Sequence, residues 1–335
     1  MMTRPGPLNL ITDVAGLTVG NASDPRLKSG VTAVICDRLT PAAVQVLGGA
    51  PGTRETDMLE PHNSIDGINA VALSGGSAYG LDAAGGVQAL LRERRIGVEV
   101  RGQIVPIVPA AILFDLTNGG DKDWGRYGPY RELGYQAAEA ADRTFELGSA
   151  GAGTGALTAG WKGGLGSASL TLENGITVGA LVAVNAVGSV TIGAGRHFWA
   201  APFEQDREFG GLGMPSPMPG DATELRIKFR DPQPIANTTL GVIATDAVMT
   251  KASAKRLAIA AHDGFARAIW PAHTPFDGDL VFALATGASG REVEPANLPE
   301  FFAVAASTMA RAIARGVYEA TAAENDLLPA WSSRR

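Results

Sequence analysis

The chain has 335 residues, of which 45% are hydrophobic and 19% charged, and 28 Lys and Arg against 34 Asp and Glu give a formal net charge of −6. This composition is typical of a folded protein with a large core and excludes a chain that is disordered along most of its length. The acidic balance argues against nucleic acid as the main partner. The single cysteine, Cys36, excludes an internal disulfide and a CxxC motif, and it favours a reducing, cytoplasmic location.

Two further features concern membranes and export. The first ten residues lack the apolar stretch of a secretory signal, and no apolar run reaches the roughly 18 residues of a membrane span. We therefore expect neither a signal peptide nor contact with a membrane.

Buried strands and helices alternate along the chain. Apolar runs bounded by glycine predict strands at 71–73, 104–108 and 176–187. The spacing of apolar residues predicts helices at 79–94, 134–143, 253–270 and 301–321. Residues 201–234 are rich in Pro and Gly, which predicts a long surface loop interrupted by a strand at 224–229.

Glycine-rich segments suggest phosphate binding, but their spacing does not support it. Residues 151–156 lack the last glycine of GxGxxG, and no Gly-Lys-Ser or Gly-Lys-Thr occurs. Residues 75–79 place Tyr79 where a GxSxG elbow needs glycine. We interpret both segments as turns.

The four histidines are His62, His197, His262 and His273, and they show no HxxH, HExxH or i,i+4 pairing. A metal site built from local ligands is therefore not expected, and His262 is interpreted as a satisfied or exposed helix residue. Without a histidine clearly placed for a triad, a hydroxyl nucleophile needs another base, for which the free amine of a chain terminus is one candidate.

That requirement directs attention to Asn237 and Thr238. Residues 238–245 form a β-branched segment that predicts a strand with two hydroxyl residues at its start. An α-amino group has a pKa of roughly 7.7 to 8.0, so an amine released at Thr238 by cleavage would act as a base beside the hydroxyl. The alternative is a loop end that simply enters a strand, and the residues alone leave both open.

A second candidate group is Asp277 and Asp279, which precede the apolar run 280–284. Two carboxylates at i and i+2 before a strand are expected to project to the same side, where one would orient the amine of a nucleophile and the other would bind its partner. The alternative is an Asp-Gly turn, which needs only one of the two.

Several segments together resemble a known family. The resemblance rests on Asn-Thr-Thr at 237–239, GVIATDA at 241–247, KASAKRLAIAAHDGFARAI at 251–269 and DGDLVFALATG at 277–287. Further segments in family order extend it over nearly the whole chain. The family is that of the self-processing N-terminal-nucleophile hydrolases, which include the L-aminopeptidase D-Ala-esterase/amidase, the β-peptidyl aminopeptidases and the nylon-oligomer endohydrolase.

The resemblance implies an α/β fold of the layered αββα type, formed by one catalytic domain over residues 1–335. It also implies self-cleavage between Asn237 and Thr238 into an α chain, 1–237, and a β chain, 238–335. In the mature enzyme the Thr238 hydroxyl would attack an amide and form an acyl-enzyme that water resolves, without metal or cofactor. Small amides or short peptides are the implied substrates, and a homotetramer is the implied assembly.

The resemblance also assigns roles to single residues. Lys162 matches the family lysine near the nucleophile, where an ammonium would lower the pKa of the amine. Asn185 matches the asparagine whose amide helps to form the oxyanion hole. Asp277 and Asp279 match acidic positions that hydrogen-bond around the nucleophile, and they look more like the nylon-oligomer hydrolase than the aminopeptidase branch, which has Ser and Glu here.

The chain departs from the family aminopeptidases at the proposed substrate pocket. Phe114 stands where they tend to have Tyr, and Ile112 where they tend to have Glu. Phe has no donor for an oxyanion and Ile has no charge for a free amine. We therefore expect an amidase that acts on ω-amide, nylon-oligomer-like or cyclic bonds. An L-aminopeptidase/D-esterase, a β-aminopeptidase, an acyltransferase such as the ornithine acetyltransferases, and a non-catalytic binding protein stay open.

Overall fold

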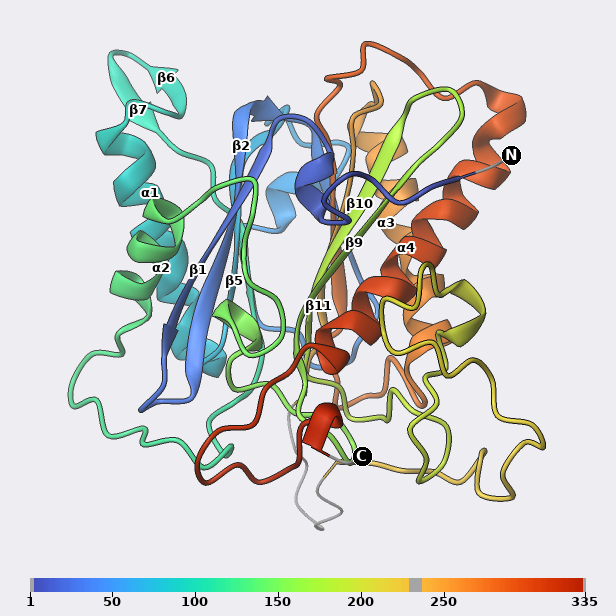
Figure 1. Ribbon diagram of the computed structural model, residues 1–335. Helices are drawn as coiled ribbons and strands as arrows, with labels where there is room; N and C mark the ends of the chain where they lie inside the picture. Colours follow the sequence, from blue (N-terminus) through green and yellow to red (C-terminus); the bar gives the residue numbers. More distant parts are fainter. Residues whose placement is uncertain (1–2, 229–236, 334–335) are drawn as a thin grey trace.

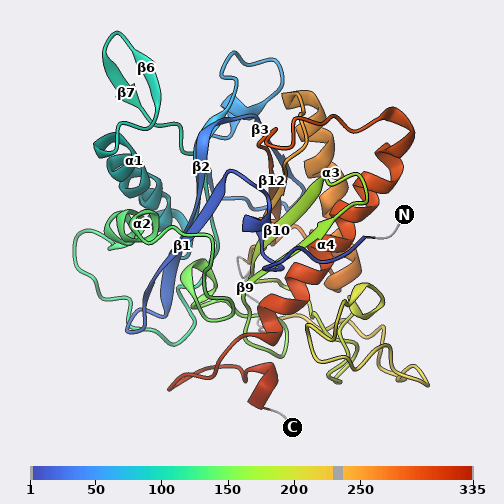
Figure 2. The ribbon, with the colours of Figure 1, turned by 45° about the horizontal axis from the view of Figure 1, so that its top comes forward.

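Two sheets lie face to face between two pairs of helices in the computed structural model, which describes residues 3–228 and 237–333 (Figure 1). Helices α1 and α2 lie on the outer side of one sheet, and α3 and α4 lie on the outer side of the other (Figure 2). This is the αββα arrangement that the resemblance implies.

The first sheet carries α1 (Ala83–Glu93) and α2 (Tyr130–Glu139) on its outer face. Its strands, in spatial order, are β1 (Leu17–Asp24), β2 (Ser29–Thr40), β5 (Ile68–Ser74), β8 (Ala110–Ile112) and β4 (Thr53–Arg54). A Cβ on Gly86 of α1 would lie 1.8 Å from the carbonyl oxygen of Arg131 on α2. The glycine that weakens α1 as a helix therefore allows the two helices to pack closely.

The second sheet carries α3 (Lys251–Ala268) and α4 (Leu298–Tyr318) on its outer face. Its strands, in spatial order, are β3 (Ala42–Val46), β12 (Leu280–Ala285), β11 (Leu240–Thr245), β10 (Thr177–Val184) and β9 (Gly164–Thr171). β11 and β12 pair in parallel, and the other neighbours in this sheet pair antiparallel. The small hairpin of β6 (Val98–Val100) and β7 (Gln103–Val105) stands apart at the top of Figure 1.

Short 3₁₀ helices connect these elements. They are Ile11–Asp13, Asp57–Leu59, Ser77–Asp82, Gly151–Gly153, Ala201–Phe203, Pro295–Asn297 and Trp331–Ser333.

The main core lies between the two sheets, and β11 shows how the sequence builds it. Leu240 and Val242 face the first sheet, whereas Ile243 faces the layer of α3 and α4. Because both faces of β11 are buried, its sequence is a continuous apolar run rather than an alternation of polar and apolar residues. This places the residues that precede β11 in the centre of the molecule.

The structure confirms the main predicted elements and corrects their limits. The strand predicted at 71–73 lies in β5, whereas the strand predicted at 176–187 is too long, since β10 ends at Val184. The helices predicted at 253–270 and 301–321 are α3 and α4. The N-terminus of α3 is earlier than predicted because the hydroxyl of Thr250 accepts a hydrogen bond from the N–H of Ser253 at 3.2 Å.

Other limits were wrong for local reasons. The predicted helix at 79–94 is divided into a 3₁₀ helix and α1, and α2 begins directly after Pro129, before the predicted start at residue 134. The predicted strand at 104–108 ends at Val105, before Pro106. Residues 224–228 are irregular, with bends at Glu224 and Lys228, instead of a strand, and Phe229 lies outside the described residues. No helix in the described ranges is long and apolar enough to cross a membrane.

Candidate active site

Thr238 lies two residues before the start of β11, close to the residues that flank β10 and β12. Its N–H donates a hydrogen bond to the carbonyl oxygen of Asn185, the residue that follows β10, at 3.0 Å. Its hydroxyl donates to the carbonyl oxygen of Asn237 at 2.6 Å. The residue is only 2% exposed, so its hydroxyl faces the interior of the uncleaved chain.

The carbonyl group of Asn237 has a second donor. The N–H of Gly278 donates to this oxygen at 2.7 Å, and the N–H of Asn237 donates to the carbonyl oxygen of Phe276 at 3.0 Å. The Asn237–Thr238 peptide bond is thus held against the loop that precedes β12. A hydroxyl beside a carbonyl that already accepts a backbone N–H is the arrangement expected for intramolecular attack.

Gly278 is required by the closeness of this contact. A Cβ at this position would lie 2.5 Å from Oγ1 of Thr238 and 2.7 Å from the carbonyl oxygen of Ala50. Residues 48–50 cover the loop from the other side, since the N–H of Ala50 donates to the carbonyl oxygen of Asp277 at 2.8 Å. Only glycine leaves room for the nucleophile and this covering segment together.

Asp277 is buried and organises the loop. Its Oδ1 accepts the N–H of Val187 at 3.1 Å, and its Oδ2 accepts the N–H and the hydroxyl of Thr274 at 2.9 and 2.7 Å. Burial and, to a smaller extent, the nearby charge of Asp279 raise the pKa of the Asp277 carboxyl.

Asp279 binds different partners. Its Oδ1 accepts the N–H of Thr239 at 2.8 Å, and its Oδ2 accepts the N–H of His273 at 3.1 Å. The two carboxylates therefore bind different groups, although each of them also accepts a backbone N–H from the adjacent residues His273 and Thr274. Asp277 holds its own loop and the chain after β10, whereas Asp279 holds the residue next to Thr238.

The amide of Asn185 has a fixed orientation. Its Oδ1 accepts the N–H of Leu157 at 3.0 Å and the ammonium or amine of Lys228 at 2.9 Å, while its Nδ2 donates to the carbonyl oxygen of Phe114 at 3.0 Å. Two donors on Oδ1 identify the other amide atom as the NH₂ group. Asn185 therefore touches Thr238 through its backbone and presents a side-chain donor nearby.

Lys228 was missed by the sequence analysis, because it lies in a Pro-rich segment interpreted as surface loop and strand. Its side chain is buried, and Nζ donates to the carbonyl oxygen of Leu157 at 2.8 Å as well as to Asn185. Burial lowers the pKa of Lys228 to about 7, although the carboxylates of Asp277 and Asp115 oppose the shift. A lysine with a pKa near 7, in a cavity that Asn237 also lines, is typical of catalytic sites.

Lys162, the lysine expected near the nucleophile, binds the C-terminal segment. Its Nζ lies 2.7 Å from Oδ2 of Asp326, and its N–H donates to the carbonyl oxygen of Pro329 at 2.9 Å. Lys28 binds the other oxygen of Asp326 at 2.9 Å. Lys162 thus helps to hold residues after α4 against the body of the protein.

The predicted pocket residues lie at two depths. Ile112 is buried at the end of β8, where its Cδ1 would lie 2.4 Å from a Cβ on Gly52. Phe114 lines a small cavity of about 10 Å³ together with Asn185, Lys228 and Asn237. That volume, bounded by the described residues alone, holds about one water molecule.

Two histidines lie at the same site. Nδ1 of His262 is 3.2 Å from Nε2 of His273, and Nδ1 of His273 is 2.9 Å from Oδ2 of Asp279. His262 is buried and hydrogen-bonded, as one of its two interpretations predicted. No group of three or more His, Cys, Asp or Glu in residues 3–228 and 237–333 is arranged to hold a metal ion.

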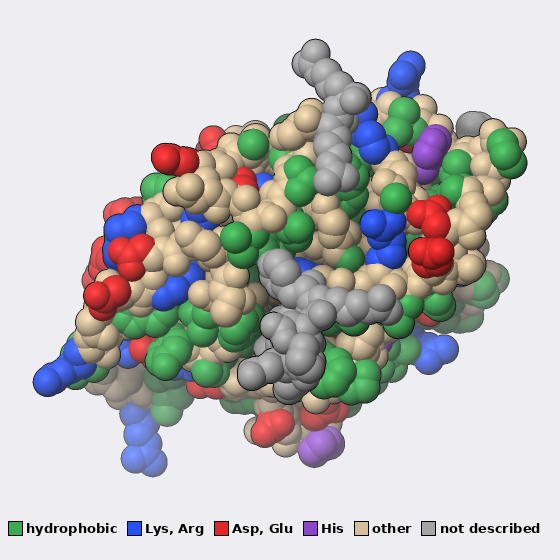
Figure 3. Space-filling model, turned by 90° about the horizontal axis from the view of Figure 1, so that it is seen from below, with side chains coloured by type: hydrophobic (Ala, Val, Ile, Leu, Met, Phe, Trp, Pro, Cys, Tyr) green, Lys and Arg blue, Asp and Glu red, His purple; other side chains and the backbone are tan. Residues whose placement is uncertain are grey.

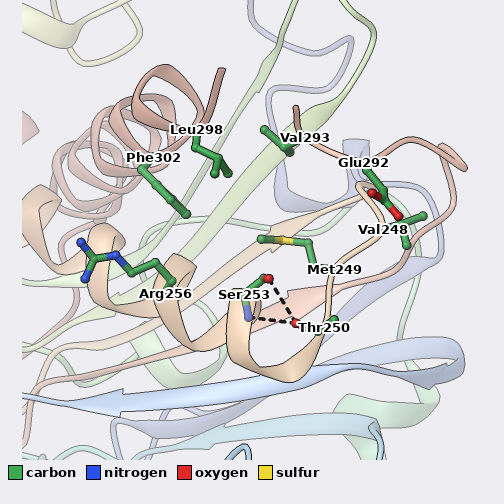
Figure 4. Close-up of a pocket in the computed structure, with 9 residues that line it drawn as sticks. All are labelled: Val248, Met249, Thr250, Ser253, Arg256, Glu292, Val293, Leu298 and Phe302. Atoms are coloured by element: carbon green, nitrogen blue, oxygen red, sulfur yellow. Dashed lines mark hydrogen bonds between the residues drawn. The ribbon is translucent and has the colours of Figure 1, made fainter. Parts of the chain in front are cut away.

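A larger cavity of about 530 Å³ lies elsewhere, between the first turns of α3 and α4 (Figure 4). It is lined by Met249, Val293 and Phe302 among others, with Arg256 at its side. Val248 follows the end of β11 opposite to Thr238, so this cavity is separate from the candidate site. On the face seen from below, acidic and basic side chains are scattered among hydrophobic ones (Figure 3).

Comparison with known proteins identifies the family. Residues 9–326 match the model of peptidase family S58. A Mycobacterium tuberculosis protein named as an uncharacterized aminopeptidase is 45% identical over 331 residues, which cover 93% of this chain and 94% of that protein. The 6-aminohexanoate-oligomer endohydrolase of Kocuria sp. (strain KY2) is 29% identical over 288 residues, which cover 82% of this chain and 74% of that protein.

One solved structure supports the fold. The L-aminopeptidase D-Ala-esterase/amidase of Ochrobactrum anthropi, described as a variant of the Ntn hydrolase fold, superposes with a TM-score of 0.71 at 21% identity. The superposition covers 98% of this chain and 92% of that one. The predicted layered α/β fold is confirmed by this likeness.

Proposed function

This chain belongs to peptidase family S58 and is a hydrolase of amide or peptide bonds, and from that premise we propose that it processes itself and uses the hydroxyl of Thr238 as its nucleophile. The observation that carries the proposal is the contact of 2.6 Å between Oγ1 of Thr238 and the carbonyl oxygen of Asn237. The N–H of Gly278 on the same oxygen, at 2.7 Å, supports attack at this bond.

Self-cleavage would proceed in two steps. Oγ1 of Thr238 attacks the carbonyl carbon of Asn237, the N–H of Gly278 stabilises the negative charge on the oxygen, and the C–N bond breaks as the hydroxyl proton passes to the nitrogen of Thr238. Water then hydrolyses the resulting ester. The products are residues 1–237, ending in a carboxylate, and residues 238–335, beginning with a free amine and a free hydroxyl.

Turnover would use the amine that cleavage creates. The nitrogen of Thr238 already faces the carbonyl oxygen of Asn185 at 3.0 Å, which would keep the amine oriented after cleavage. The amine accepts the proton of the hydroxyl as Oγ1 attacks the substrate, and it returns the proton to the leaving amine. Water hydrolyses the acyl-enzyme and restores Thr238.

Asn185 and Lys228 are assigned to the oxyanion side of the site. The NH₂ group of Asn185 is a donor beside the small cavity, and Lys228 fixes the orientation of that amide by binding Oδ1. The family resemblance places Lys162 near the nucleophile. In this proposal Lys162 holds the segment after α4 in place through its ion pair with Asp326.

We propose an uncharged amide within a short chain, such as an ω-amide, as the substrate. Ile112 and Phe114 support this proposal because neither offers a charge for a free amine. The relatedness to an oligomer endohydrolase supports it as well. Aminopeptidase action is the second candidate, supported by the relative with 45% identity that is named an aminopeptidase. Acyl transfer would be recognised by acylation of an added amine in preference to hydrolysis.

Two further proposals concern the assembly and its location. The family resemblance supports a homotetramer, which sedimentation of the purified protein would test. A cytoplasmic location is supported by Cys36, which is a free, buried cysteine in a chain without another.

The decisive experiment is the intact mass of the purified protein under denaturing conditions, with N-terminal sequencing of each fragment. We expect a fragment that begins Thr238-Thr239-Leu240. A single uncut chain after prolonged incubation would contradict the proposal. Incubation of the cleaved protein with 6-aminohexanoate oligomers and with short peptides would then separate the two candidate substrate classes.

A further inference from the structure

A line of hydrogen bonds leads away from the nucleophile into the protein. Oδ2 of Asp279 is 2.9 Å from Nδ1 of His273, and Nε2 of His273 is 3.2 Å from Nδ1 of His262. Nε2 of His262 is in turn 2.9 Å from the carbonyl oxygen of Gln45. The line joins the loop before β12 to α3 and β3, and Asp279 connects it to the N–H of Thr239.

The end of this line fixes the proton on His262. A carbonyl oxygen only accepts hydrogen bonds, so Nε2 of His262 must carry hydrogen toward Gln45. Burial lowers the pKa of His262 to about 4, although the hydrogen bond to Gln45 opposes the shift, so the imidazole is neutral at pH 7. Nδ1 of His262 therefore carries a lone pair and accepts.

The next two contacts follow from this assignment. Nε2 of His273 must donate to His262. Nδ1 of His273 and the carboxylate of Asp279 can then form a hydrogen bond only if one of the two carries a proton. Asp279 already accepts two backbone N–H groups, from Thr239 and from His273 itself. Both bonds favour the carboxylate, which leaves the proton on the ring and makes His273 an imidazolium.

We infer that His273 and His262 are positioning residues of the active site, with a positively charged His273 that holds the Asp279 carboxylate against Thr239 and a neutral His262 that holds His273. The inference rests on the proposed role of Thr238. Its consequence is that the residue next to the nucleophile is fixed by a charge pair as well as by the sheet.

The surroundings of the pair support this role. The titratable groups that face His262 are His273 and Asp279, and Asp277 faces Asp279 from the same loop. The ring of Phe265 on α3 packs on both imidazoles, with centroid distances of 5.2 Å to each. An imidazolium here offsets one of two buried carboxylates that are only two residues apart, which would otherwise repel each other.

The protonation states are tested first, in a chain that needs no activity. In the Thr238→Ala variant, ¹⁵N spectra of labelled histidines at pH 7 are expected to show hydrogen on Nε2 alone for His262 and on both nitrogens for His273. Variants of each histidine assign the signals. Hydrogen on Nδ1 of His262, or a neutral His273, overturns the inference whatever happens at Thr238.

Two substitutions then separate the contacts of His273. The side-chain amide of Asn takes the place of Nδ1, and that of Gln takes the place of Nε2. His273→Asn keeps a donor for Asp279 but removes the positive charge. Without that charge the Asp279 carboxylate is protonated more easily, so the pH below which self-cleavage slows is expected to rise. His273→Gln leaves Asp279 without its side-chain donor, so cleavage is expected to slow by about tenfold or more.

The matched control is His62→Asn, since His62 is exposed. Rates equal to wild type in both His273 variants, or an equal loss in both without a rise in the pH below which cleavage slows, overturn the positioning role. Failure of the wild-type chain to cleave would instead count against Thr238 as the nucleophile, because the spectra of the Thr238→Ala variant do not depend on that step.

Discussion

The N–H of Gly278 donates a hydrogen bond to the carbonyl oxygen of Asn237 at 2.7 Å, and the two residues lie 41 positions apart. One short loop therefore supplies both a backbone donor for this carbonyl and the carboxylate of Asp279 that binds the N–H of Thr239, the residue after the nucleophile. A backbone donor is independent of side-chain rotamers and of pH, so its direction is set as soon as β11 and β12 pair.

Gly278→Ala tests this arrangement. The added Cβ would lie 2.5 Å from Oγ1 of Thr238 and 2.7 Å from the carbonyl oxygen of Ala50, so the hydroxyl or the loop must move. We expect self-cleavage to slow about 100-fold, as displacements of about 1 Å do in catalysis. The measurement is the cleaved fraction over time on denaturing gels. Gly220→Ala, where an added Cβ meets nothing within 4 Å, is the control, and equal rates for the two variants would refute the argument.

Thr238→Ala should give an intact chain without hydrolase activity, because processing and turnover share one hydroxyl. Thr238→Ser should retain some cleavage. Thr239→Ala is the matched control, because Asp279 binds the backbone N–H of Thr239 and this contact survives the change. Mass spectrometry of all three variants checks the prediction. A cleaved, active Thr238→Ala chain would transfer the role to another residue.

Lys228→Met should slow cleavage about tenfold, because Oδ1 of Asn185 loses one of its two donors. Lys251→Met, which removes another lysine that donates to backbone carbonyls, should cleave at the wild-type rate. If the two variants cleave equally fast, Lys228 does not orient Asn185.

The same substitution predicts a pH dependence of stability. The pKa of Lys228 falls from 10.5 in the unfolded chain to about 7 in the folded one, so between these values the unfolded chain binds the proton more strongly. The free energy of unfolding of the chain with Lys228 should therefore rise with pH from about 7 to 10.5 relative to Lys228→Met. Urea unfolding of both chains in the uncleaved Thr238→Ala background measures this difference, and parallel curves would contradict it.

His262 predicts sensitivity to acid. Its pKa is lowered from 6.5 to about 4, so in this range the unfolded chain binds a proton that the folded chain excludes. Stability should fall as pH falls from 6.5 toward 4, by about 3 kcal/mol at most. His262→Gln keeps a donor for Gln45 and does not titrate, so its unfolding free energy should depend less on pH. His62→Asn should leave the wild-type slope unchanged.

Phe114→Tyr addresses substrate choice. Phe114 lines the small cavity beside Asn185, and a hydroxyl there would add a donor on the oxyanion side. We expect turnover of aminopeptidase substrates to rise relative to that of internal amides. The ratio of kcat/KM for the two classes is the measurement. An unchanged ratio would mean that the missing hydroxyl does not separate this chain from the aminopeptidases.

The sequence predicted the parts of the site that are local. Asn237 and Thr238 are adjacent, and Asp277 and Asp279 precede a recognisable strand, so composition and spacing alone drew attention to them. Resemblance added Asn185, whose backbone contact with Thr238 follows from the pairing of β10 with β11.

Contacts between distant segments, which depend on the order of strands in the sheet, could not be predicted from local sequence patterns. His273 meets His262 only because α3 packs on β3 and β12, although a signal existed for His262, which shares a helical stripe with the buried Ala258, Ala261 and Phe265. Lys228 gave no such signal, since it stands between Ile227 and Phe229 in an alternating segment, where a lysine is expected on the exposed face of a strand.

The positions of β11 and β12 in the second sheet determine whether the two pieces of a chain cleaved before Thr238 can separate. Both strands come from the segment after the break, and they lie between β10 and β3, which come from the segment before it. The two pieces therefore share one sheet. Their separation would break the hydrogen bonds between β10 and β11 and between β12 and β3, and it would expose the core between the sheets. Dissociation of the pieces would be the same event as unfolding, so a cleaved molecule should melt in one transition.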